Sequence, residues 1–170
     1  MRVMAFNGSP RKGWNTAALL EKVLEGAASA GAETRLVHLY DLHYQGCVSC
    51  FACKERGGKS YGACAVQDDL TPVYAEIRGV DAIVLGSPIY FGDVTGEMRS
   101  FLERLLFPFH VYEDPPGSLF PRPIRTAWIY TMNVTGDQAR QLGYDRLFES
   151  NERIMRTVFG ASRSMMCYDT

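Results

Sequence analysis

The sequence predicts an α/β fold, a three-layer sandwich around a five-stranded parallel sheet in the order 2-1-3-4-5. Three observations predict it. Short apolar runs alternate with segments of helical period, which is the pattern of parallel βαβ units. The run 81–86 is almost continuously apolar, as expected of a strand that is buried on both faces. A polar loop directly follows the first apolar run and leads into the first helix.

The elements follow from the spacing of apolar residues along the chain. Leu20, Val23, Leu24 and Ala27 mark one face of the first helix, and either Asp68 or Asp69 can cap the second. The third helix has an apolar face, with Glu97, Arg99, Glu103 and Arg104 on its outer face. The expected strands are 2–6, 33–39, 81–86, 125–131 and 162–168. The first expected helix begins near Thr16, and the other three span about 68–78, 98–105 and 142–159.

Residues 1–170 are expected to form a single domain, because a chain of this length can bury a substantial core. No period holds across a cysteine-rich insertion loop at about residues 41–66. Five prolines forbid a regular element over 107–123. Long loops inside a compact domain are usually functional or mobile, so the cysteine-rich loop is a candidate site.

Charge and composition exclude several function classes. The net charge is −1 and no basic run occurs, so nucleic acid is not expected as a partner. No apolar stretch has membrane-spanning length, and the glycine loop begins too early for a signal peptide. The five cysteines are an odd number and too closely spaced for a secreted disulfide framework. The expected location is therefore the cytoplasm, without membrane attachment.

The loop between the first strand and the first helix has the composition of a phosphate-binding site. A helix N-terminus presents free backbone N–H groups and partial positive charge, and Gly8 and Gly13 would let the loop curl around an anion. The alternative is an ordinary turn whose polar side chains only cap the helix. The candidate phosphate-binding residues are Ser9, Arg11, Lys12, Asn15 and Thr16.

The same loop limits which phosphate ligand fits. It approaches the nucleoside-triphosphate pattern G-x-x-x-x-G-K-[ST], but Trp14 replaces the lysine and Asn15 replaces the metal-binding hydroxyl residue. It also lacks G-x-G-x-x-G, the turn that binds a dinucleotide pyrophosphate. A single terminal phosphate, as on FMN, is the remaining fit.

In a sheet of order 2-1-3-4-5, ligands bind between the carboxyl ends of the first and third strands. The loop after the third strand is apolar and aromatic, which suits the flat isoalloxazine ring of a flavin. The alternative is that its aromatic residues are core residues under the next helix. The candidates are Pro88, Ile89, Tyr90, Phe91, Gly92 and Asp93, with Thr131, Met132 and Asn133 after the fourth strand as a third loop.

The segments GSPRKGWNT and GSPIYFGDVTGEMRSFLERL resemble the NAD(P)H-dependent FMN reductases, and most of all the iron–sulfur flavoproteins and their cluster-lacking relatives. The resemblance implies a flavodoxin-like fold, bound FMN and a homodimer or homotetramer. Ser9, Arg11, Asn15 and Thr16 match the phosphate positions of the family, and residues 88–92 match its ring-binding loop. The sequence departs from the family at Gly13-Trp14, and it ends at Thr170 where relatives continue with a helix that covers one sheet face.

The cysteine-rich loop contains Cys47-x2-Cys50-x2-Cys53-x10-Cys64. This spacing is more typical of an iron–sulfur cluster than of zinc, which prefers paired cysteine knuckles. In the iron–sulfur flavoproteins the gap before the fourth cysteine is shorter. Three alternatives stay open: a [4Fe–4S] cluster, free or disulfide-paired thiols, and zinc. Cys167 lies in a strand pattern and is expected in the core.

These features predict an FMN-dependent oxidoreductase that takes electrons from NAD(P)H and passes them to an unknown acceptor. A flavin carries the redox chemistry itself, so no catalytic side chain is expected. One alternative is an iron–sulfur flavoprotein that relays single electrons between a [4Fe–4S] cluster and FMN. The other is a flavin-binding module without catalytic activity.

Overall fold

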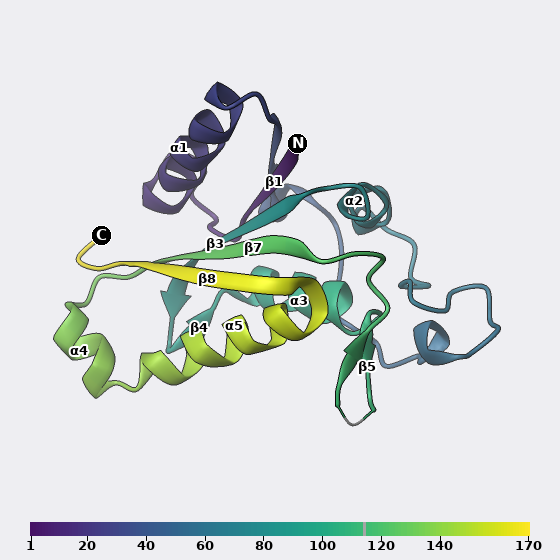
Figure 1. Cartoon of the computed structure of the whole chain (residues 1–170). Helices are drawn as coiled ribbons and strands as arrows, with labels where there is room; N and C mark the ends of the chain where they lie inside the picture. The colour runs from purple at the N-terminus through teal and green to yellow at the C-terminus, as the bar shows by residue number, and fades with distance from the viewer. Residues whose placement is uncertain (114) are drawn as a thin grey trace.

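The computed structural model describes residues 1–113 and 115–170, arranged around a parallel sheet in the order β2-β1-β3-β7-β8 (Figure 1). This confirms the predicted strand order and the flavodoxin-like α/β class. A short strand, β4, pairs antiparallel with β3, and β5 and β6 form a separate hairpin. The strands are β1 (Arg2–Asn7), β2 (Glu33–His38), β3 (Ala82–Tyr90), β4 (Asp93–Val94), β5 (His110–Val111), β6 (Gly117–Ser118), β7 (Ile124–Thr131) and β8 (Gly160–Cys167).

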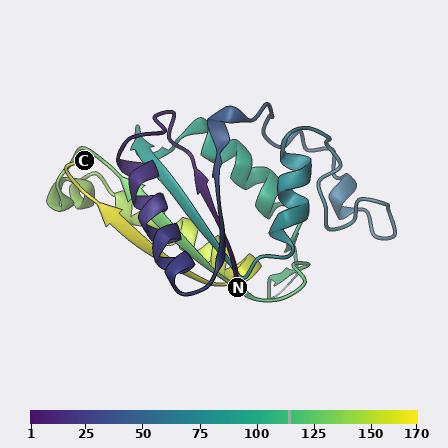
Figure 2. The ribbon, with the colours of Figure 1, turned by 90° about the horizontal axis from the view of Figure 1, so that it is seen from above.

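Helices cover both faces of the sheet. On one face, α1 packs Leu20 and Leu24 against Val3, Val84 and Ile129 of the strands below it. On the other face lie α2, α3 and α5, and α2 is beside α3 when the molecule is seen from above (Figure 2). The α-helices are α1 (Asn15–Ser29), α2 (Leu70–Ile77), α3 (Gly96–Leu106), α4 (Gly136–Gln141) and α5 (Tyr144–Phe159), and the short 3-10 turns are η1 (Leu39–Asp41) and η2 (Ala52–Lys54).

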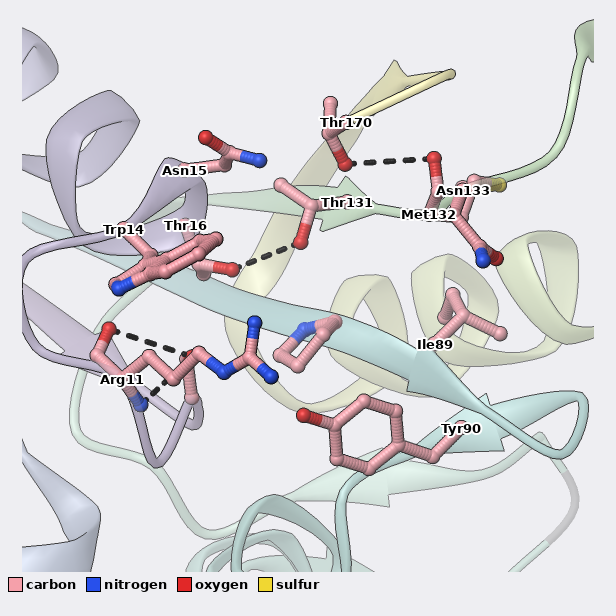
Figure 3. A pocket seen from close by; sticks show the side chains of 12 residues that line it. Arg11, Trp14, Asn15, Thr16, Ile89, Tyr90, Thr131, Met132, Asn133 and Thr170 are labelled. Atoms are coloured by element: carbon pink, nitrogen blue, oxygen red, sulfur yellow. Dashed lines mark hydrogen bonds between the residues drawn. The ribbon is translucent and has the colours of Figure 1, made fainter.

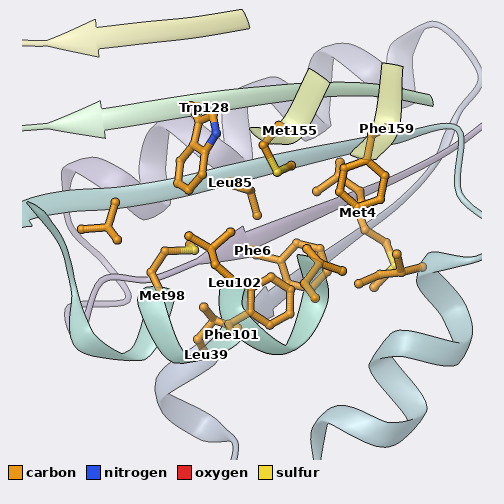
Figure 4. Close-up of a cluster of buried hydrophobic side chains, with 14 of the residues drawn as sticks. Met4, Phe6, Leu39, Leu85, Met98, Phe101, Leu102, Trp128, Met155 and Phe159 are labelled. Atoms are coloured by element: carbon orange, nitrogen blue, oxygen red, sulfur yellow. The ribbon is translucent and has the colours of Figure 1, made fainter. Parts of the chain in front are cut away.

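The larger core lies beneath α3 and α5 (Figure 4). Phe6 of β1 stacks on Phe101 of α3 with ring centroids 4.7 Å apart, and Trp128 and Tyr130 of β7 stack at 5.1 Å. Alternate residues of each strand face this core, while the residues between them face α1. Both faces of β1, β3 and β7 are therefore largely buried, which accounts for their mostly apolar sequences.

The register brings three loops to one edge of the sheet. Asn7 at the end of β1 pairs with Gly86 of β3, and Pro88 of β3 pairs with Thr131 at the end of β7. Because these strands are parallel, their carboxyl ends lie side by side, as the topology requires of a binding edge.

The third strand is longer than predicted. The sequence indicates a loop from Ser87, but β3 continues to Tyr90 and turns through two residues into β4. Both turn residues, Phe91 (φ 52°) and Gly92 (φ 83°), have positive φ, as a two-residue hairpin turn of type I′ requires. The strand continues past Ser87 because Ile89 pairs with Val94 of β4, and a local sequence pattern cannot show such a pairing.

Two other predictions about the chain were wrong. Arg104, predicted on the outer face of its helix, is buried. The segment 107–123, predicted without regular structure, contains the β5–β6 hairpin. The helix predicted over 142–159 is present as α5, and Gly143 at φ 76° separates it from the short helix α4, which the sequence did not indicate.

On the α1 face, the edge strand β8 is partly uncovered. Met165, which pairs with Ile129, keeps 43% of its surface exposed. Within residues 1–113 and 115–170, α1 is the helix that packs on this face. No helix in these residues is long and apolar enough to cross a membrane.

Candidate functional site

A pocket of about 380 Å³ lies where the loops after β1, β3 and β7 meet (Figure 3). Eight of the twelve residues predicted to bind the cofactor line it, and it lies at the predicted edge of the sheet. A volume of this size is in the ordinary range for small-molecule sites. The lining residues are Ser9, Arg11, Trp14, Asn15, Thr16, Pro88, Ile89, Tyr90, Thr131, Met132, Asn133 and Thr170.

Hydrogen bonds fix the loop between β1 and α1. The Gly8 N–H donates to the Gly86 carbonyl at 2.8 Å, and the Thr95 hydroxyl donates to the Gly8 carbonyl at 2.7 Å. The Ser9 N–H donates to the side-chain oxygen of Asn7 at 3.0 Å. Gly8 does not have positive φ. Glycine is needed there because an added Cβ would lie 2.9 Å from the Met98 Cβ and 3.2 Å from the Gly86 carbonyl oxygen.

The N-terminus of α1 lies at this pocket without a side-chain cap. Trp14 occupies the N-cap position in extended conformation, and its side chain accepts no capping hydrogen bond. The hydroxyl of Thr16 instead bonds that of Thr131, at 2.8 Å (Figure 3). The predicted alternative, that polar side chains cap the helix, thus has no capping hydrogen bond at the N-cap to support it. The first N–H groups of α1 remain available to an anion.

Arg11 provides positive charge at the pocket. Its guanidinium carbon lies 4.6 Å from the centroid of the Trp14 ring, and its side chain extends across the opening toward Tyr90 (Figure 3). Lys12, the next residue, is outside the lining, and its amino group pairs with Asp41 at 2.5 Å. The structure thus separates two cations that the sequence placed together.

The β3–β4 hairpin contributes only its first part to the pocket. Ile89 and Tyr90 line it, whereas Phe91 and Gly92 at the turn and Asp93 beyond it do not. Phe91 is fully exposed at the tip of the turn. Asp93 pairs with Arg99 of α3 at 3.0 Å. The roles predicted for these three residues and for Lys12 stay predictions.

Thr170 is a pocket residue that the sequence did not indicate. Its N–H and hydroxyl both donate to the Met132 carbonyl, at 3.1 and 3.3 Å. Since it lies after the last strand with no motif around it, no sequence signal could have identified it. Trp14 was noticed only as a departure from the family pattern, and Figure 3 shows it beside Arg11 at one end of the pocket.

The four cysteines of the cysteine-rich loop surround one small hollow of about 20 Å³. Cys47, Cys50, Cys53 and Cys64 all line it, and none forms a disulfide. Within the described residues, no three His, Cys, Asp or Glu side chains are placed so that they could hold a metal ion. The thiol donor set fits an iron–sulfur cluster or zinc, but the hollow has room for about one water molecule. A bound centre would require the loop to widen.

The conformation of this loop depends on two left-handed residues. Ser49 (φ 52°) and Phe51 (φ 58°) lie between the first three cysteines and turn the chain back on itself. Burial raises the pKa of the Cys53 thiol, and the nearby sulfurs of Cys47, Cys50 and Cys64 raise it further, although Lys54 opposes them. The other three cysteines therefore lie close enough to Cys53 to act on its thiol.

The sheet order and the pocket at its carboxyl edge define a flavodoxin-like protein with an anion-suited site. Residues 1–125 match the family model of the NADPH-dependent FMN reductases, and the chain belongs to this family. It is 35% identical over 104 residues to an iron-sulfur flavoprotein of Methanocaldococcus jannaschii and 38% identical over 104 residues to one of Archaeoglobus fulgidus. Each match covers 61% of this chain, and 51% and 48% of the respective relative. The chain thus spans about half the length of these curated relatives.

Solved structures share the fold. An NAD(P)H:quinone oxidoreductase from Methanothermobacter marburgensis superposes with a TM-score of 0.79 at 15% identity, covering 100% of this chain and 87% of its own. An FMN-dependent NADH-azoreductase from Bacillus anthracis, solved with FMN, gives 0.69 at 9% identity, covering 99% and 88%. At such identities the likeness shows the fold alone.

Proposed function

We propose that the chain is an FMN-dependent oxidoreductase that accepts electrons from NAD(P)H and passes them to an acceptor. The observation that carries the proposal is the uncapped N-terminus of α1, which opens with Arg11 into a pocket at the carboxyl edge of the sheet. Membership of the FMN reductase family supports the same cofactor. When bound, FMN would supply hydride acceptance from the nucleotide and onward transfer of one or two electrons.

The residues around the pocket divide the binding task between them. The amides at the start of α1, with Ser9, Arg11 and Asn15, would hold the phosphate, because N–H donors and a cation converge there. Ile89 and Tyr90 would lie against the ring, since they are the apolar and aromatic side chains that the β3–β4 hairpin contributes to the lining. The third loop, after β7, would contact the ring from the other side of the pocket.

The test is anaerobic reduction of the FMN-loaded full chain. We expect NADH or NADPH to bleach the visible flavin absorption and an added acceptor to restore it. Bleaching by neither nucleotide would contradict the reductase. If a reduced ferredoxin bleached the flavin instead, the electron carrier would be supported, and a flavin that no donor reduced would indicate a binding module.

A second candidate function is supported by the cysteine-rich loop. All four free cysteines line one hollow, and the first relatives are named iron-sulfur flavoproteins. We propose that a thiolate-ligated centre, a [4Fe–4S] cluster before zinc, binds Cys47, Cys50, Cys53 and Cys64. Iron and sulfide determination after anaerobic purification tests this: a stoichiometric cluster supports electron relay, and its absence after reconstitution contradicts it.

We also propose a cytoplasmic homodimer or homotetramer. Phe91, fully exposed on the turn beside the pocket, supports a subunit contact near the flavin. Light scattering of the FMN-loaded chain tests this assembly, and a monomer at working concentration would contradict it.

A further inference from the structure

Arg104 of α3 is a buried cation whose contacts converge on the cysteine-rich loop. Its side chain is 1% exposed. Its guanidinium donates to the backbone carbonyl of Gln45 at 3.2 Å and to that of Val66 at 3.1 Å, so it joins the two ends of the loop. The Nε–H points to the sulfur of Cys64 at 3.4 Å. One side chain therefore holds both ends of the loop and one of its four sulfurs.

Asp68 compensates the buried charge. Its carboxylate receives two hydrogen bonds from Arg104, one of them at 3.1 Å. An arginine guanidinium keeps its proton in proteins, and the Asp68 carboxylate balances its positive charge here. The guanidinium consequently stays charged, and a charged donor makes a stronger bond to an electron-rich sulfur.

Arg104 is also fixed in place by the helix that carries it. Phe101, Leu102 and Leu105 of α3 are all in the core, so the backbone below Arg104 cannot shift easily. The neighbouring Glu103 accepts the Cys47 N–H at 3.0 Å, so the same helix turn also holds the first cysteine. Thus α3 forms a rigid base for the loop, with Arg104 at the Cys64 end.

We propose that Arg104 is a positioning residue that directs the Cys64 sulfur toward a metal centre and tunes that centre through an N–H···S bond. The inference rests on the second candidate function, the thiolate-ligated centre. Outer-shell partners orient the ligands of metal sites, and hydrogen bonds to the ligating sulfurs help to set the reduction potential of iron–sulfur clusters. Loss of the Nε–H should weaken metal binding and make any cluster harder to reduce.

The geometry requires arginine rather than lysine. A planar guanidinium offers five N–H donors in a fixed fork, and here they serve a sulfur, two carbonyls and a carboxylate together. A lysine ammonium has three donors at one point and cannot reach all four partners. Arg104→Lys therefore keeps the charge beside Asp68 while it loses the simultaneous contacts.

A purely structural role would also weaken metal binding, so the test is a double-mutant cycle with Co²⁺ as the probe. The full chain is titrated with Co²⁺ as wild type, Arg104→Lys, Cys64→Ser and the double variant. We expect Arg104→Lys to weaken binding about 10- to 100-fold when Cys64 is present and less than about threefold in the Cys64→Ser background. We also expect the thiolate-to-cobalt absorption band to move to lower energy in Arg104→Lys, because the sulfur loses a hydrogen bond.

The control is Arg122→Lys. Arg122 likewise donates to a backbone carbonyl (Val80, 2.7 Å) and to a carboxylate (Asp81, 2.8 Å), but it contacts no cysteine in the described structure. This variant should bind Co²⁺ like the wild type. If Arg104→Lys does not fold, Asp68→Asn replaces it in the same cycle, since it weakens the guanidinium's anchor.

Several outcomes would overturn the inference. If Arg104→Lys weakened Co²⁺ binding equally with and without Cys64, Arg104 would have only a structural role. An unshifted charge-transfer band would exclude the N–H···S bond. A wild-type chain that gave no thiolate-to-cobalt band would remove the metal centre itself. FMN binding, measured on the same samples, would stay intact in each case, so failure here is separate from failure of the flavin site.

Discussion

The hydroxyl oxygens of Thr16 and Thr131 lie 2.8 Å apart, although 115 residues separate them in the chain. Thr16 lies in the first turn of α1 and Thr131 ends β7, so this bond joins the helix to the far side of the pocket. Both side chains are buried, at 3% and 4% exposure. The bond closes the pocket floor between two of its three loops.

This pair gives a prediction about stability. Replacing either residue by valine leaves the other hydroxyl buried and unpaired, which should cost about 1–3 kcal/mol of unfolding free energy. Replacing both removes the unpaired group, so the double variant should lose clearly less than the sum of the single losses. Urea unfolding of the flavin-free chain measures all four free energies. Additive losses would show that the two hydroxyls do not depend on each other.

Arg11 and Lys12 provide a second prediction, since the structure places only Arg11 at the pocket. Arg11→Ala should weaken FMN binding about 10- to 100-fold, because a charge-assisted bond to phosphate contributes about 1.5–3 kcal/mol. Riboflavin, which lacks the phosphate, should bind both proteins alike. Flavin fluorescence quenching measures these affinities.

The matched control is Lys12→Ala, which should change FMN affinity less than about threefold because its charge is already paired with Asp41. Equal losses for the two variants would mean that the bound loop differs from the arrangement seen here. An Arg11→Ala variant that bound riboflavin as poorly as FMN would move Arg11 away from the phosphate.

Much of this site could be predicted from the sequence because its signals are local. The donor-rich loop and the apolar residues after β3 carry patterns that require no knowledge of distant contacts. The position of Arg104 could not be predicted. Helical period places it on the outer face of α3, and only the folding of a remote loop over that face buries it. The sequence likewise could not show that Lys12 forms an ion pair with Asp41 and lies outside the pocket that Arg11 lines. Nor could it show that pairing with β4 extends β3 past Pro88.

The close approach of α1 to β3 gives a third prediction. A Cβ on Gly86 would lie 2.7 Å from the Leu20 Cδ1 and 2.9 Å from the Thr16 Cγ2. Gly86→Ala should therefore push the start of α1 away from the sheet, cost about 1–3 kcal/mol and weaken FMN binding. Urea unfolding and flavin titration of the same samples measure both effects.

The control for Gly86 is Gly26, an exposed glycine inside α1 with nothing within 4 Å of an added Cβ. Gly26→Ala should stabilise the chain by about 0.5–1 kcal/mol, because alanine is the better helix former. The same glycine-to-alanine substitution is thus expected to lower the free energy of unfolding at position 86 and to raise it at position 26. A neutral Gly86→Ala would mean that α1 can move outward without cost.

Tyr130 gives a prediction about alkaline pH. Its side chain is fully buried on β7, where its hydroxyl accepts a hydrogen bond from the Asn151 amide at 3.1 Å. Burial raises the pKa of Tyr130, and the bond from Asn151, which favours the phenolate, offsets this only in part. Tyr44 and Tyr74 have their pKa raised by burial as well.

The sign of the effect follows from which state loses its proton first. In the unfolded chain a tyrosine ionises near its ordinary pKa of about 10, whereas the buried residue keeps its proton to higher pH. Stability from this source is therefore complete below about pH 10 and is lost as pH rises from there toward the folded-state pKa. Urea unfolding of the wild type across this pH range should show the stability falling.

The variant Tyr130→Phe should be less stable at neutral pH, since Asn151 loses its acceptor. Its stability should fall less steeply with pH, because one titrating group is gone. Parallel curves for the two proteins would show that Tyr130 ionises equally easily in both states.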